Sequence, residues 1–220
     1  MRTARIALCI LALSIPLPML AHGQTPPAES LTPTTPTLAD VDPDLLQAVI
    51  ADQWDRGMDM FGGRPAKMAA PPDWNAIATR DKERQALVRA LVSKGALKSA
   101  REYQFAALIF QHSPEAADLR LAHLLAVTAA LKGQPTAKWL AAAALDRYLW
   151  NTNQPQIFGT QFKQTEGRDG IWTMEPYDSE ALSDSIRAEW CVVPLSEERA
   201  ALAALKAGQP PNATTTSDCH

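Results

Sequence analysis

The helix-capping signals between residues 42 and 206 constrain the fold more than any other feature of the sequence. Asp42 followed by Pro43 is typical of an N-cap and a first-turn proline, and predicts a helix to about residue 56. Ser99 and Glu102 form a capping box: the Ser99 side chain can accept from the Glu102 backbone amide, and the Glu102 side chain from the Ser99 backbone amide. Similar signals, including expected caps at Asp178 and Ser196, predict helices over residues 79–95, 99–112, 113–132, 135–150, 179–189 and 197–206.

These helices predict a mainly α fold. Hydrophobic residues make up 46% of the 220 residues and charged residues 20%, which is sufficient for a buried core. The Lys94-Gly95 and Lys132-Gly133 pairs each end one helix and precede another, a spacing similar to tetratricopeptide or Sel1 repeats. Only two such units occur, and a repeat array needs three or more. We therefore expect an antiparallel helical bundle with repeat-like helix pairs.

The segment 154–177 interrupts the helical pattern with three glycines and two prolines. Weak alternation predicts a short β-hairpin, or an irregular segment, with strands over 156–162 and 171–174. Two interpretations are open. The segment can be a binding loop, with Trp172 stacking on a peptide or glycan, or a lid whose aromatic side chains turn inward.

Both ends of the chain differ from the middle. Arg2 and Arg5 precede a short apolar run, and Ala21 and Gly23 fit the positions before a signal-peptidase cleavage site. We expect a signal peptide at 1–23, a Pro/Thr-rich tether at 24–37, a single helical domain at 38–207 and a disordered tail at 208–220. The chain is then exported, to the periplasm or outside a bacterial cell, with no membrane span after signal cleavage.

Cys191 and Cys219 are the two cysteines that remain after removal of the signal peptide. In an oxidising compartment they can form a disulfide that attaches the tail to the domain. The alternative is a buried Cys191 and a free Cys219. The polar surroundings of Cys219, the penultimate residue, favour the alternative.

Several classes of function are excluded or disfavoured by the sequence. A formal net charge of −3 argues against nucleic-acid binding, which needs a surplus of Lys and Arg. The chain has no Gly-rich phosphate loop, Gly-x-Ser-x-Gly elbow, His-Glu-x-x-His or Cys-x-x-Cys motif. His112 and His123 lie about ten helical residues apart, too far to share a metal at ~1.5 Å per residue. We expect no metal and no cofactor, and interpret His123 as structural.

Three short motifs resemble an uncharacterised bacterial family that is defined only as a domain of unknown function. They are Gln111-His112, Asp146-Arg147 and the segment Phe158-Gly159-Thr160-Gln161, in which the family usually has Tyr at the first position. The resemblance covers about residues 79–206. It implies a helical fold in which the three motifs lie near one another, and it implies no particular activity.

The same residues allow a functional and a structural interpretation. In the functional one, His112, Asp146, Arg147, Thr160 and Gln161 form a polar pocket, with His112 and Asp146 as an acid–base pair. Arg147 and Gln161 would then hold an anionic or amide ligand. In the structural one, which we favour, Asp146 pairs with Arg147 across helices, Gln161 satisfies loop backbone groups, and His112 caps its own helix.

The sequence therefore predicts an exported helical binding or structural module of the cell envelope. We expect a monomer whose partner is an envelope protein, a peptide or a glycan. Catalysis is the less favoured alternative, in the form of a small envelope hydrolase that uses His112 and Asp146. The candidate ligand contacts are Arg147, Thr160, Gln161 and Trp172.

Overall fold

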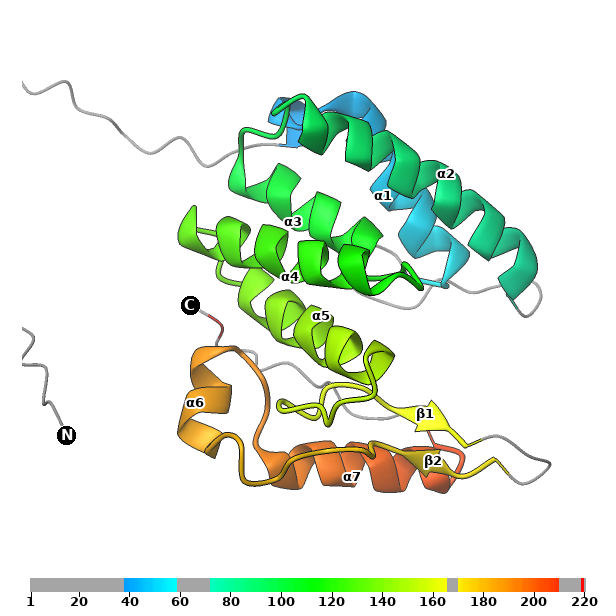
Figure 1. Cartoon of the computed structure of the whole chain (residues 1–220), viewed down its shortest axis with the longest axis vertical. Coiled ribbons are helices and arrows are strands. Elements are labelled where there is room, and N and C mark those ends of the chain that lie inside the picture. The colour runs from blue at the N-terminus through cyan, green and yellow to red at the C-terminus, as the bar shows by residue number, and fades with distance from the viewer. Residues whose placement is uncertain (1–37, 59–71, 166–169, 210–218, 220) are drawn as a thin grey trace, which may run out of the picture. The chain divides into compact units, whose positions relative to one another are not determined.

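The structure, a computed structural model, describes residues 38–58, 72–165, 170–209 and 219 (Figure 1). All of them fall within one unit of the chain, Pro36–His220. The predicted signal peptide at 1–23 and the tether at 24–37 lie outside the described residues. So does most of the predicted tail at 208–220.

The predicted fold class is confirmed, since the described part of the chain is mainly helical with one small antiparallel hairpin. Strand residues Lys163 and Gln164 pair with Thr173 and Trp172, respectively. The elements are the 3-10 helix η1 (Leu38–Asp40), helices α1 (Pro43–Asp55), α2 (Trp74–Ser93), α3 (Ala100–Phe110), α4 (Ala116–Leu131) and α5 (Ala137–Asn151), strands β1 (Lys163–Gln164) and β2 (Trp172–Thr173), and helices α6 (Asp184–Glu189) and α7 (Leu195–Lys206).

The caps explain where most helices begin. The Asp42 side chain accepts hydrogen bonds from the first-turn amides of α1, and Ser99 and Glu102 form the expected capping box of α3. Three predicted starts were wrong. Helix α2 begins at Trp74 and not near 79, because Asp73 caps it, and α6 begins after Ser183 and not after Asp178. Helix α7 begins at Leu195 after Pro194, so Ser196 lies inside the helix and does not cap it.

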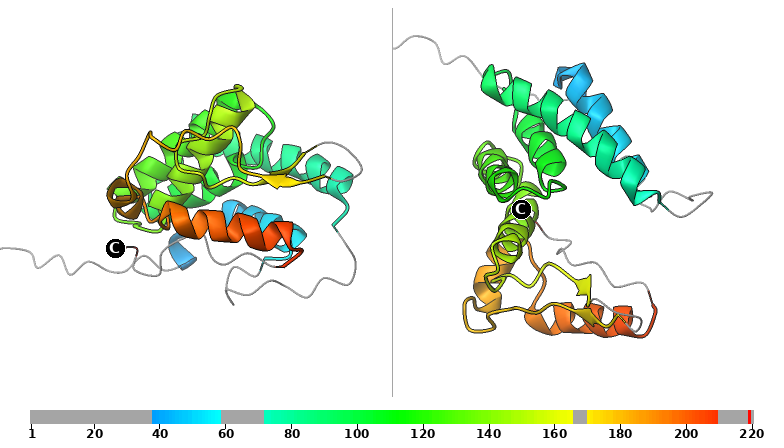
Figure 2. Two further views of the ribbon diagram at one scale, coloured as in Figure 1. Left: turned by 90° about the horizontal axis from the view of Figure 1, so that it is seen from below. Right: turned by 45° about the vertical axis from the view of Figure 1, so that its right-hand side comes forward.

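Small side chains allow helices α3, α4 and α5 to pack closely. Helix α4 lies between α3 and α5, while α1 and α2 pack on α3 from the other side (Figures 1 and 2). Six alanines at these contacts have no exposed surface, and without long side chains the helix axes can approach one another. These alanines are Ala106, Ala107, Ala122, Ala126, Ala141 and Ala144.

The described parts of the segment 154–177, residues 154–165 and 170–177, pack between α5 and the C-terminal helices (Figure 2). Phe158 is 3% exposed and packs with Ala142 and Val192 in a second hydrophobic cluster, with its ring 5.3 Å from that of Trp190. Trp172 is only half-buried. At Phe158 the segment therefore corresponds to the lid interpretation, in which the aromatic side chain turns inward.

Cys191 and Cys219 form a disulfide, so the expectation of a free Cys219 was wrong. Their Cα atoms lie 5.3 Å apart, and both sulfur atoms lie within 3.8 Å of the carbonyl oxygen of Pro135. Local composition around Cys219 indicated only a polar tail. The pairing depends on the position of Cys191 at the end of α6, which composition does not reveal.

Two tryptophans lie on the surface. Trp54 and Trp74 are each 62% exposed. Trp54 lies near the end of α1, and Trp74 is the first residue of α2. Within the described segments, no helix is both long and apolar enough to cross a membrane.

Candidate functional site

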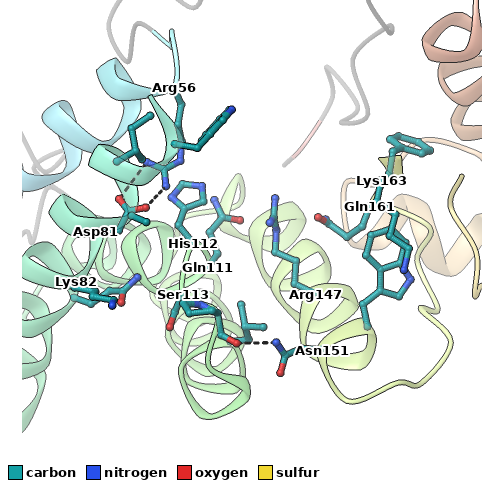
Figure 3. Close-up of a pocket in the computed structure, with 18 of the residues that line it drawn as sticks. Arg56, Asp81, Lys82, Gln111, His112, Ser113, Arg147, Asn151, Gln161 and Lys163 are labelled. Carbon is teal, nitrogen blue, oxygen red and sulfur yellow. Dashed lines mark hydrogen bonds and ion pairs between the residues drawn. The ribbon is translucent and has the colours of Figure 1, made fainter. Parts of the chain in front are cut away.

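A cavity of about 950 Å³ lies where α1, α2, the α3–α4 turn, α5 and strand β1 meet (Figure 3). Its walls come from segments far apart in the sequence, from Arg56 on one side to Lys163 on the other. Figure 3 shows side chains from these segments projecting toward the same space. The size is that of a small-molecule site.

The cavity is lined by positive charge in a chain with a formal net charge of −3. Four cationic side chains, Arg56, Lys82, Arg147 and Lys163, line it together with one carboxylate, Asp81. Lys163 also lies over the ring of Trp150, with its Nζ 4.7 Å from the ring centroid. An arrangement of this kind attracts anions.

Arg56 is neutralised by two carboxylates. It contacts Asp52 at 2.8 Å on its own helix and Asp81 at 2.6 Å on α2, and so joins the two helices. Asp55 extends this network to Arg80 and Arg84 of α2. Burial alone would raise the pKa of Asp55, but the hydrogen bonds from Arg80 and Arg84 outweigh it and lower that pKa.

Arg147 has no carboxylate partner and no hydrogen-bond acceptor among the residues that the structure describes. Its Nε is buried and unpaired. Burial, with a smaller contribution from the charge of Arg56, lowers the pKa of Arg147 below its usual value. The Nε–H of Arg147 is therefore a desolvated donor beside the cavity, while the residue as a whole is partly exposed.

Three glutamines also line the cavity, Gln85, Gln111 and Gln161. The Nε2 of Gln85 is buried and has no hydrogen-bond partner, while that of Gln161 donates to Thr160 Oγ1 at 2.9 Å. Together with Arg147, Gln85 gives the cavity wall two buried donors without acceptors. Both unmet groups are donors, so their natural complement is a ligand rich in acceptor oxygens.

His112 pairs with Asp52 and not with Asp146. Its Nδ1 lies 3.1 Å from Asp52 Oδ1, across the gap between the α3–α4 turn and α1. Burial lowers the pKa of His112, and the nearby charges of Arg56 and Arg147 lower it further, against the opposing effect of Asp52. His112 is therefore neutral at neutral pH.

Asp146 anchors the loop that follows α5. It is fully buried, and its carboxylate accepts hydrogen bonds from the backbone amides of Ile157, Phe158 and Thr160 at 2.9–3.0 Å. The Thr160 hydroxyl adds a fourth at 2.8 Å. Burial raises the pKa of Asp146, and these four hydrogen bonds oppose that shift. Gly159 lies within the anchored loop with φ +74°, a conformation that favours glycine.

The structure divides the predicted site residues into two groups. His112, Arg147 and Gln161 line the cavity, whereas Asp146 and Thr160 hold the loop and do not line it. Trp172 lies on β2 and does not line the cavity either. The motifs that carry the family resemblance therefore contribute Gln111-His112, Arg147 and Gln161 to one cavity.

The structural interpretation was wrong in its details. Asp146 and Arg147 do not pair with each other, and His112 contacts Asp52 where we expected it to cap its own helix. Gln156, not Gln161, satisfies the loop backbone: its side chain donates to the carbonyls of Gln161 and Met174 and accepts from the Gln161 amide.

Sequence reasoning also missed three contributors to the site. Asp52 and Arg56 stand four residues apart on α1, a spacing that indicates one helix face but not a contact with His112. Gln85 gave no signal at all, because a single glutamine in a polar helix has no distinctive pattern.

Among the described residues that line the cavity or lie beside it, no hydroxyl is placed as the nucleophile of a hydrolase. The Thr160 hydroxyl donates to Asp146, and the Ser113 hydroxyl donates to Asp118 at 2.8 Å. Among the described residues, no group of three or more His, Cys, Asp or Glu side chains is placed to hold a metal ion. What the site offers is a set of donors and cations around an open space.

Comparison with protein-family models, with curated proteins and with solved structures finds no significant match for this chain. The resemblance to the uncharacterised bacterial family therefore stays a prediction from its three motifs. The interpretation of the cavity rests on its own geometry.

Proposed function

We propose that the chain is an exported binding module of the cell envelope whose cavity takes a small anionic ligand on Arg147. The observation that carries this proposal is the buried, unpaired Nε–H of the Arg147 guanidinium on the cavity wall. Leaving a buried donor without an acceptor costs about 1–3 kcal/mol, and native proteins normally pair such groups. A bound anion would supply the missing partner.

The hydrogen-bonding groups without partners indicate the chemistry of the ligand. Arg147 Nε and Gln85 Nε2 are both donors, so the ligand must bring acceptors. A guanidinium offers parallel N–H groups that match the two oxygens of a carboxylate or phosphate. Lys82 and Lys163 at the cavity add positive charge that would favour the same ligand.

Binding is a better account of the site than hydrolysis by His112 and Asp146. That pair is not formed, because Asp146 is engaged by the loop and His112 by Asp52. Export is supported by the signal-like N-terminus and by the Cys191–Cys219 disulfide, since disulfides persist in oxidising compartments.

The proposal is tested by isothermal titration calorimetry of the mature chain with phosphate, sulfate and citrate. We expect saturable binding of at least one anion, weakened roughly 10- to 100-fold by Arg147→Met, because a hydrogen bond to a charged group contributes about 1.5–3 kcal/mol. Arg120→Met, the same change on the exposed face of α4, is the control and should bind as the wild type does. Failure of all three anions to bind, or an unaffected Arg147→Met variant, would overturn the proposal.

A further inference from the structure

We propose that the ligand's oxyanion also carries a hydrogen-bond donor, as hydrogen phosphate does, and that His112 Nε2 accepts this hydrogen bond beside Arg147. This inference rests on the proposed function and specifies the chemistry of the ligand at the same site. It assigns His112 a role in selecting one class of oxyanion over another.

The contact with Asp52 determines which nitrogen of His112 carries the proton. The Asp52 carboxylate is 1% exposed and also contacts Arg56, so it acts as an acceptor. Nδ1 of His112, 3.1 Å away, must then donate to it. In a neutral ring the remaining nitrogen, Nε2, is an acceptor. No partner for Nε2 lies in the described part of the chain.

Burial favours the neutral form of the His112 ring, and the positive charges near it act in the same direction. Asp52 and Arg56 face it from α1, Arg147 from α5, and Asp81 of α2 lines the same cavity and binds Arg56. Both arginines oppose protonation of His112, and part of the negative charge of Asp52 is taken up by Arg56. A neutral acceptor therefore lies among cationic donors on the wall of one cavity.

An acceptor beside a cation discriminates between oxyanions of the same shape. Sulfate at neutral pH has only acceptor oxygens, so an oxygen placed against His112 Nε2 would leave two lone pairs facing each other. Hydrogen phosphate is also tetrahedral but keeps one O–H, which can donate to Nε2 while its other oxygens accept from Arg147. A carboxylate with a neighbouring hydroxyl or N–H group presents the same combination.

The test compares phosphate and sulfate affinities of the mature chain by calorimetry at about pH 8, where a histidine with a lowered pKa is neutral. The wild type should bind phosphate about tenfold more tightly than sulfate, because one additional hydrogen bond contributes about that much to an affinity. His112→Phe, which removes the acceptor, should bring the ratio of the two affinities close to one.

Two further variants make the outcome unambiguous. His112→Gln serves if His112→Phe does not fold, because its amide N–H can donate to sulfate and should also remove the preference for phosphate. The control is His123→Gln, in which the replaced ring contacts the Ala141 carbonyl at 2.9 Å and does not line the cavity, and it should keep the wild-type ratio.

The possible results separate the two proposals. Equal affinities for phosphate and sulfate in the wild type, both lost in Arg147→Met, would overturn the role of His112 and leave the anion site standing. A phosphate preference that survives in both His112 variants would also overturn it. Absence of binding by either anion would contradict the anion site, and this inference with it.

Discussion

Asp146 and Arg147 are neighbours on α5, yet their side chains differ in whether they have hydrogen-bond partners. Asp146 is fully buried and accepts four hydrogen bonds from the loop that follows its helix. Arg147 points to the cavity and has no partner among the described residues. The first residue is part of a loop anchor, and the second is part of a cavity wall.

This difference distinguishes polar groups that stabilise the fold from polar groups that are available to bind a ligand. A buried polar side chain whose partners all lie in the same chain stabilises one conformation, as Asp146 does. A buried donor at an open cavity adds nothing to folding unless something enters to pair with it. We expect mutations in the loop anchor to affect stability and mutations in the cavity wall to affect binding.

A third buried group belongs to neither class. Glu198 is fully buried on α7, and its oxygens have no hydrogen-bond partner in the described structure. Its nearest cation is Arg187, with Nη2 at 3.8 Å from Oε1. Burial raises the pKa of Glu198 to about 8, despite the opposing charge of Arg187. Glu198 does not line the cavity, so it is expected to influence stability alone.

The largest effect is expected from Asp146→Ala. It would leave two buried amides, of Phe158 and Thr160, and the partly buried amide of Ile157 without their acceptor. The free energy of unfolding should fall by roughly 4–6 kcal/mol, because each buried unpaired amide costs about 1–3 kcal/mol. Denaturant unfolding monitored by circular dichroism measures this, and a loss below about 1 kcal/mol would contradict the anchoring role of Asp146.

Phe158→Ala should rank next. The ring packs on Trp190 and is 3% exposed, so its removal should lower the free energy of unfolding by roughly 3–5 kcal/mol. Trp172 is half-buried on β2, and Trp172→Ala should cost only about 1–2 kcal/mol. Denaturant unfolding of the two variants under the same conditions gives both values. Equal losses of unfolding free energy would show that Trp172 belongs to the core as much as Phe158 does.

Glu198→Gln should stabilise the domain in alkaline solution. A carboxyl group whose pKa is raised on folding favours the protonated form, so stability falls as the pH rises from about 4.5 through 8. The uncharged amide removes this loss, and the variant should gain roughly 2–4 kcal/mol near pH 9 with little change near pH 4. The measurement is the free energy of unfolding of variant and wild type between pH 4 and pH 9. If the two proteins show the same dependence on pH, Glu198 does not cause the loss of stability.

Much of the fold could be predicted from the sequence, because helix caps act locally. Asp42 and the Ser99–Glu102 box specify the starts of α1 and α3 within a few residues. The errors occurred where several local signals compete. Both Asp178 and Ser183 are suitable caps: Asp178 accepts from the Glu180 amide in a turn, whereas Ser183 caps α6.

The site was predicted only in part, because its partners are distant in the sequence. His112, Arg147 and Gln161 could be selected by residue type, and all three line the cavity. The contact between His112 and Asp52 joins residues 60 positions apart, and no local pattern connects them. For Asp146 the sequence suggested either an ion pair with Arg147 or, in the less favoured alternative, acid–base chemistry with His112. Its actual partners are three backbone amides and the Thr160 hydroxyl, which no sequence pattern indicates.

The most direct test of the account is the free energy of unfolding of Arg147→Met, with and without phosphate. Without phosphate, the variant should stay within about 1 kcal/mol of the wild type or exceed it, since a buried donor without an acceptor is replaced by an apolar side chain of similar length. Excess phosphate should stabilise the wild type, by about 2.7 kcal/mol at 100 times the dissociation constant, and leave the variant nearly unchanged. A loss of several kcal/mol without phosphate, or equal stabilisation of both proteins by phosphate, would contradict the claim that Arg147 is held for a ligand.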